Sequence, residues 1–128
     1  MQIVRESFTK NAWFELSTIE QLANIGGDVE MAIYWRGKGD QLQVNDQVDK
    51  VLELLELTII DPKNVKRLRE ITAVKALVLD DFRGGNEYQS TDEAWHKYFA
   101  FFTHLVKTGQ GKNYDTSNYA TASKRTNT

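Results

Sequence analysis

Apolar residues recur at steps of three and four along most of the chain, which is the spacing of an amphipathic helix. Four segments carry this pattern, and capping residues, glycines or a proline bound each of them. We predict helices at about 12–36, 40–60, 62–83 and 90–108. The short connections favour an all-α protein, most simply a four-helix up-down bundle. A three-helix core with an irregular N-terminal arm is the alternative.

Two capping signals and one glycine refine this outline. Ser17 followed by Glu20 has the spacing of a capping box, so the first helix can restart there, and Ser90 followed by Glu93 has the same spacing at the start of the fourth helix. Gly26 lies on the apolar stripe of the first helix, where a glycine costs roughly 1 kcal/mol relative to alanine. We therefore expect another helix to pack closely against the backbone at Gly26.

The apolar pattern ends at Gly109. Serine, threonine, asparagine and lysine dominate the rest of the chain, which is typical of a solvated tail. We expect one helical domain at 1–109 and a flexible polar C-terminal tail at 110–128. The few charges of the tail are mostly basic, so the acidic excess belongs to the helical domain.

The second predicted helix carries more apolar surface than one core face needs. Leu54, Leu57 and Ile60 lie on the far side of its main stripe, so either a further helix of the same chain or a partner subunit should cover them. With Phe101 of the fourth helix, these residues are our candidate self-association interface.

The composition narrows the classes of protein that fit. The chain has 128 residues and no cysteine, which excludes disulfides and thiolate chemistry and fits a reducing compartment. Its net charge of -2 provides no overall basic field for nucleic acid. No run approaches the roughly 20 apolar residues of a membrane span, and the N-terminus lacks the apolar core of a signal peptide. We expect a cytoplasmic protein without membrane contact.

A basic cluster opens the third predicted helix. Its members are Lys63, Lys66, Arg67 and Arg69. Cations at a helix N-terminus oppose the macrodipole, so the cluster is a candidate site for phosphate, nucleic acid or an acidic protein surface. The alternative is that the cations pair with nearby carboxylates, for example Asp61 or Glu70.

Two charged residues interrupt the apolar stripes of their helices, Glu30 in the first and Lys75 in the third. An unpaired charge in the core would be costly, so we predict a buried or half-buried Glu30–Lys75 pair that fixes the register of the two helices. A location at the edge of the core is the alternative for each side chain.

The sequence predicts no catalytic constellation, metal site or cofactor. Glu93 and His96 form one Glu-x-x-His element of the kind found in di-iron bundles, but His104 lacks the matching glutamate. Asp80 and Asp81 suit a solvated helix end better than a cation site. We therefore predict that the protein is not an enzyme.

Three stretches carry a resemblance to known proteins, namely Leu22–Glu30, Leu54–Asn64 and Gly85–Trp95. They resemble a group of small uncharacterised microbial helical proteins, over roughly Trp13 to Lys107. The resemblance implies a single all-helical domain and transfers no catalytic residue. Met31 is a departure, since the resemblance leads us to expect a basic residue there.

Two hypotheses for the function follow. The first is a helical-bundle binding or scaffold module that self-associates through its surplus apolar faces. The alternative is a nucleic-acid-associated accessory protein that contacts phosphates through the basic cluster of the third helix.

Overall fold

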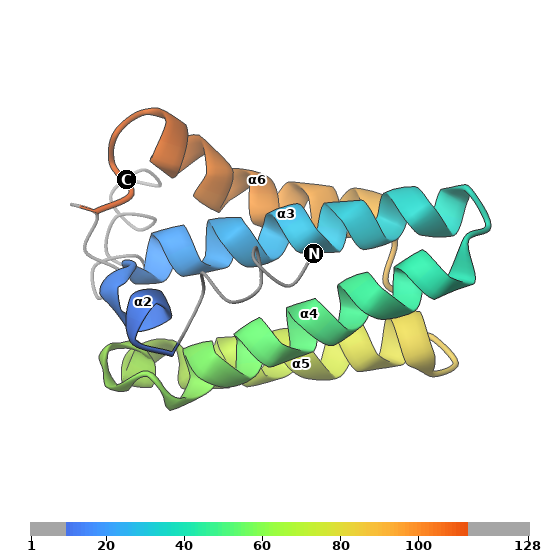
Figure 1. The fold of residues 1–128 in the computed structure, drawn as a ribbon, viewed down its shortest axis with the longest axis horizontal. Coiled ribbons are helices and arrows are strands. Elements are labelled where there is room, and N and C mark those ends of the chain that lie inside the picture. The colour runs from blue at the N-terminus through green and yellow to red at the C-terminus, as the bar shows by residue number, and fades with distance from the viewer. Residues whose placement is uncertain (1–9, 113–128) are drawn as a thin grey trace, which may run out of the picture.

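The computed structural model describes residues 10–112, and this part of the chain is all-helical, as predicted. It contains no strand (Figure 1). Its helices are α2 (Lys10–Glu15), α3 (Thr18–Gly37), α4 (Gln41–Ile60), the 3₁₀ helix η1 (Pro62–Arg67), α5 (Leu68–Arg83) and α6 (Asp92–Lys107). No helix in these residues is long and apolar enough to cross a membrane.

The first predicted helix is two helices, because α2 ends at Glu15 and α3 begins at Thr18, which confirms the restart that the Ser17–Glu20 spacing left open. Ser17 is the N-cap of α3, and its hydroxyl accepts from the backbone N–H of Glu20 at 3.1 Å. The carboxylate of Glu20 accepts in return from the backbone N–H of Ser17 at 2.9 Å. This confirms the predicted capping box, which provides partners for two backbone donors at the start of α3.

The other helix ends lie close to the predicted positions, with two differences. Asp40 caps α4 as predicted, and Gly109 follows α6 with a φ of 81°. The cap of α6 is Thr91 and not the predicted Ser90, since the Thr91 hydroxyl accepts from the backbone N–H of Ala94. The third predicted helix begins as η1 and becomes α-helical only at Leu68.

The turn after α6 packs back onto the start of α3. The Ser17 hydroxyl donates to the carbonyl of Gly111 at 2.7 Å, and Lys112 lies 3.3 Å from the carboxylate of Glu20. Burial alone would raise the pKa of Glu20, but its bonds with Ser17 and Lys112 and the charge of Lys112 lower that pKa below the ordinary value. Residues 110–112 are thus bound to the helices, and the rest of the predicted tail lies outside the described residues.

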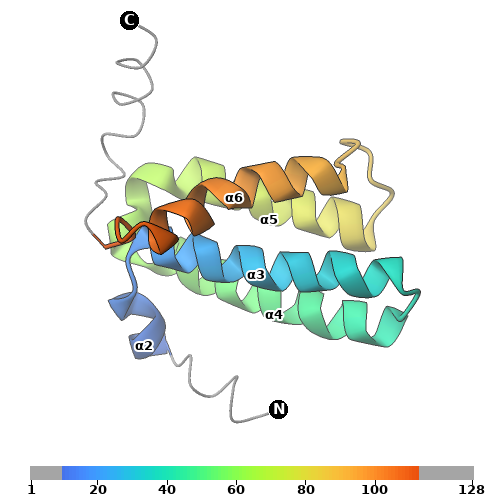
Figure 2. The ribbon, with the colours of Figure 1, turned by 90° about the horizontal axis from the view of Figure 1, so that it is seen from above.

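Helix α3 is the centre of the arrangement. It packs against α4 along one side and against α6 along another, while α4 also packs against α5. Figure 2 shows α5 and α6 on the same side of the α3–α4 pair. The backbones of α5 and α6 approach each other less closely than those of the helix pairs above. We call the side between α5 and α6 the open side of the assembly.

Helix α6 packs closely against α3 at Gly26, as predicted from the position of Gly26 on the apolar stripe. A Cβ atom at residue 26 would lie 2.7 Å from both Cβ and Cγ of Phe99, well inside van der Waals contact. Phe99 is itself buried. The missing side chain therefore makes room for the aromatic residue, and this contact holds α6 on α3.

A buried polar network fills the space where α2, α3, α4 and η1 meet. Its members are Trp13, Thr18, Gln21, Thr58, Asp61 and Asn64. The indole N–H of Trp13 donates to the hydroxyl of Thr58 at 2.9 Å, and this hydroxyl donates to the carbonyl of Leu54 at 2.7 Å. These bonds hold α2 against the end of α4.

Asn64 is the hub of the network. Its amide donates to the side-chain oxygen of Gln21 and to the carbonyl of Thr58, both at 2.9 Å. Gln21 donates in turn to the carboxylate of Asp61, and Thr18 donates to the side-chain oxygen of Asn64. Because buried amides and hydroxyls are costly without partners, these bonds fix how η1 sits against α3.

Replacing Gly26 by alanine should reduce the free energy of unfolding by about 1–3 kcal/mol, because the new methyl group overlaps Phe99. Gly27→Ala is the matched control. A Cβ at residue 27 meets nothing within 4 Å, so alanine there should stabilise the protein by up to about 1 kcal/mol. Urea unfolding followed by circular dichroism measures both, and equal effects would contradict the close contact.

Thr58→Val should reduce the free energy of unfolding by about 1–3 kcal/mol, because it removes the buried hydrogen bond from the indole N–H of Trp13 to the Thr58 hydroxyl. Thr72→Val is the control, since Thr72 is exposed and its hydroxyl donates to carbonyls of its own helix. The same urea experiment compares the two variants. A loss at Thr58 no larger than that at Thr72 would show that the Trp13–Thr58 bond contributes nothing to stability.

Candidate functional site

The predicted basic cluster does not form one site. Lys63 binds the carboxylate of Asp61 and the carbonyl of Phe14, and Arg67 is buried. Arg67 donates through Nε and Nη2 to the carboxylate of Glu70 at 2.7–3.0 Å. Lys63 and Arg67 therefore pair with carboxylates of the same chain, as the alternative prediction had it.

Lys66 and Arg69 are the exposed remainder of the cluster. No ion pair found among residues 10–112 includes either of them.

The four residues of the predicted interface do not share one exposed surface. Leu54 is 5% exposed and belongs to the core, while Leu57 and Phe101 are half-buried. Ile60 is 54% exposed. Helix α4 contacts α2 and α5 as well as α3, so helices of the same chain cover most of the surplus apolar face.

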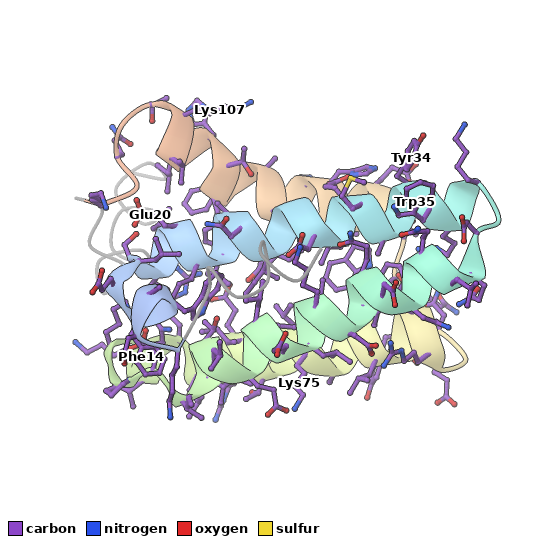
Figure 3. All side chains as sticks on the ribbon, viewed as in Figure 1. Phe14, Glu20, Tyr34, Trp35, Lys75 and Lys107 are labelled. Atoms are coloured by element: carbon purple, nitrogen blue, oxygen red, sulfur yellow. The ribbon has the colours of Figure 1, made fainter. Side chains whose placement is uncertain are left out.

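The predicted Glu30–Lys75 pair is wrong. Glu30 lies 2.6 Å from Nδ1 of His96 on α6, and Lys75 binds Glu56 on α4. The reason is the packing order, because α3 lies against α4 and α6 whereas α5 lies against α4. Figure 3 shows Lys75 on the α4–α5 side of the molecule, away from α3.

The open side between α5 and α6 holds an apolar groove of about 320 Å³. Helix α5 contributes Glu70, Ala73, Val74 and Leu77, and the loop and α6 contribute Ser90, Ala94, Trp95 and Tyr98. The α5 residues follow the i, i+3, i+4, i+7 spacing of one helix face. Val74 and Trp95 are buried, whereas Ala73 and Ala94 are exposed and leave the groove open. We take this groove as the candidate binding site.

A hydrogen-bonded carboxylate closes one end of the groove. The hydroxyl of Tyr98 donates to Oε2 of Glu70 at 2.5 Å, and Arg67 donates to both oxygens of the same carboxylate. The guanidinium of Arg67 also lies 5.3 Å from the centre of the Phe102 ring. These bonds hold the Tyr98 ring in place as a wall of the groove.

A second polar bridge holds Trp95. Its indole N–H donates to Oδ2 of Asp81 at 2.7 Å, and the Asp81 side chain is only 4% exposed. Arg36 binds Asp81 at 3.0 Å and Asp92 at 2.9 Å, so it joins α3, α5 and α6. Partial burial by itself lowers the pKa of Arg36, but its bonds with Asp81 and then Asp92 raise that pKa above the ordinary value.

The groove is suited to binding an apolar group. Its aromatic walls are held by hydrogen bonds before anything binds, which limits the entropy lost on binding. Glu70 is already engaged by Arg67 and Tyr98, so the interior is mainly hydrocarbon surface. Pockets between helices with this lining are common ligand sites.

A larger groove of about 550 Å³ lies beside α4. Its lining includes Leu52, Leu54 and Leu57, but also four charged residues, namely Lys10, Lys50, Glu53 and Glu56. It begins at Lys10, the first residue that the structure describes. The groove between α5 and α6 has only one charged residue in its lining, Glu70, and this carboxylate is already hydrogen-bonded, so it is the better candidate for an apolar occupant.

The residues considered for metal chemistry have other partners. His96 binds Glu30, and Asp80 accepts from the backbone N–H groups of Glu87 and Tyr88 in the loop after α5. Asp81 supports Trp95, as described above. Within residues 10–112 there is no group of three or more histidines, aspartates or glutamates placed to hold a metal ion.

The sequence pattern missed the groove, although it placed Trp95 and Tyr98 on the aromatic stripe of α6. Their role as walls depends on which helices are neighbours, and a helical projection of one segment does not contain that information. One signal was available. Alanines occupy exposed positions 73 and 94 on facing helices, where long polar residues are usual.

Comparisons with known proteins do not assign the chain to a family. The chain matches no protein-family model, no curated protein and no solved structure.

Glu30→Gln should lower the pKa of His96. In the native protein the hydrogen bond to Glu30 raises this pKa, with smaller contributions from the charges of Glu30, Asp92 and Glu93. The raised pKa means that the pair stabilises the fold below about pH 6.5 and loses this contribution as the pH rises through the folded-state pKa.

An NMR titration of the His96 imidazole measures the effect. Glu87→Gln, a change at an exposed residue of the loop after α5, is the control. An unchanged His96 pKa in Glu30→Gln would show that the pair does not form in solution.

Proposed function

We propose that the protein is a non-enzymatic binding module of the cytoplasm, built as a four-helix up-down bundle of α3 to α6 with α2 packed on one end. The observation that carries the proposal is the apolar groove on the open side between α5 and α6. Its occupant is the apolar face of a helix from a partner protein.

The spacing of the lining residues supports a helical occupant. One face of α5 and one face of α6 line the groove, so a further helix laid between them would meet two apolar rows. The small side chains of Ala73 and Ala94 let a helix backbone approach closely. Tyr98 supplies an aromatic contact, a residue type enriched among those that dominate binding energy at protein interfaces, and the buried Trp95 supports the wall of the groove.

The structure reduces the number of residues available to each of the two functions predicted from the sequence. Self-association through Leu54, Leu57, Ile60 and Phe101 stays a prediction, but it must now use a surface from which Leu54 is largely absent. Phosphate binding through the basic cluster keeps Lys66 and Arg69, because Lys63 and Arg67 are bound to carboxylates. We therefore favour the groove over both.

Filling the groove should abolish binding of an apolar probe. We expect Nile red, an uncharged dye whose emission rises in apolar sites, to bind the wild-type protein and to bind Ala73→Phe at least about tenfold more weakly. Ala76→Phe is the matched control, since Ala76 is exposed on the same helix and does not line the groove. Fluorescence titration gives the dissociation constants.

A second pair tests the opposite wall. Ala94→Phe should weaken the dye as Ala73→Phe does, whereas Ala100→Phe, on the same helix outside the groove, should not. Circular dichroism checks that all four variants remain folded. Equal dye affinity in the groove variants and their controls would overturn the assignment of the site.

A further inference from the structure

The segment Asp61–Arg69 has a burial pattern with a period of three. Its buried positions are Asp61, Asn64 and Arg67. Its exposed apolar positions are Pro62, Val65 and Leu68. Its exposed cationic positions are Lys63, Lys66 and Arg69. A 3₁₀ helix has three residues per turn, so each set forms a column along η1 and into the start of α5.

The buried column anchors this segment. Asp61 and Asn64 belong to the polar network, and Arg67 binds Glu70. The bonds of Asp61 and Asn64 to Gln21 therefore set the rotation of η1 against α3, and the Arg67–Glu70 bond joins the end of η1 to the start of α5. The two outer columns are presented to solvent in a fixed orientation.

The apolar column is unusually exposed. Val65 is 68% exposed and Leu68 is 37% exposed, and Ile60 precedes them at the end of α4. The described residues cover none of these three side chains fully. Rigid apolar side chains in water lose little entropy when a partner covers them, so this column is a candidate contact surface.

The cationic column lies beside it. Lys63 is neutralised by Asp61, but Lys66 and Arg69 have no ion pair with any described residue. We propose that the two columns together are a docking surface for an acidic amphipathic helix of a partner protein. Its apolar residues would cover Val65 and Leu68, and its carboxylates would pair with Lys66 and Arg69.

Spacing and charge favour this partner. Lys66 lies near the end of η1 and Arg69 is the second residue of α5, so with rises of about 2.0 and 1.5 Å per residue the two are about 5–6 Å apart along the axis. Residues four apart in an α-helix are separated by about 6 Å. Glutamates four apart can therefore meet Lys66 and Arg69 in turn. Binding to an anionic membrane typically involves a cluster of about 4–8 cations, more than this surface has. A nucleic-acid phosphate backbone would pair with the cations but would leave the adjacent apolar column uncovered. This surface is separate from the groove between α5 and α6, so each can fail without the other.

The test uses a fluorescent synthetic helical peptide with glutamates four positions apart beside a leucine stripe, and fluorescence anisotropy. Wild-type protein should bind it, and a peptide with glutamine in place of glutamate should bind at least about tenfold more weakly. Lys66→Glu with Arg69→Glu should reduce binding by a similar factor. Lys97→Glu with Lys107→Glu, the same charge change at exposed positions of α6, should reduce it much less.

A second pair of variants tests the apolar column. Val65→Ser should weaken the peptide, whereas Leu42→Ser should not, although Leu42 is 79% exposed on α4. Single-stranded DNA and anionic lipid vesicles are the competing probes. Tighter binding of either one, or equal peptide binding by the charge variant and its control, would overturn the proposal.

Discussion

The close approach of α3 and α6 at Gly26 is the constraint on which the shape of the binding surface depends. Phe99 occupies the space that a side chain at position 26 would need, so α6 is bound to α3 along its buried face. Trp95 and Tyr98 join α6 to α5 through hydrogen bonds to Asp81 and Glu70. The groove lies on the α5–α6 side, where the two helix backbones are farther apart than those of α3 and α6.

The buried polar network determines how the short helix η1 is rotated about its own axis. Apolar contacts allow a helix to turn slightly and repack, because many arrangements bury similar area. Hydrogen bonds do not allow such a rotation, since a small turn of the helix separates donor from acceptor and leaves buried polar atoms without partners. Gln21 and Asn64 thus specify the orientation of η1, whereas the leucines and valines around them supply most of the burial.

Local signals in the sequence were sufficient for the helices and for some of their ends. The Ser17–Glu20 capping box, the Asp40 cap and the close contact at Gly26 all depend on residues within one turn or on one stripe. Predictions that needed the neighbours of a helix failed. Glu30 pairs with His96 because α6, and not α5, lies beside α3.

The basic cluster was misread for a related reason. A helical projection with 3.6 residues per turn places Lys63, Lys66 and Arg67 on one face. The segment is a 3₁₀ helix, however, and has three residues per turn. With the observed period, Arg67 faces inward to Glu70 while Lys66 faces solvent. The period of three is visible in the sequence only once the 3₁₀ geometry is known.

The 3₁₀ segment also restricts how the chain length can vary. Each residue of η1 advances the side chain by a third of a turn, so one inserted or deleted residue between Asp61 and Arg67 would rotate everything beyond it into the next column. An insertion between Asp61 and Lys63, for example, would bring Lys63 to the position that faces Gln21 and would move Asn64 into the exposed apolar column. A change of three residues would restore the phase, which makes the length of this loop variable only in whole turns.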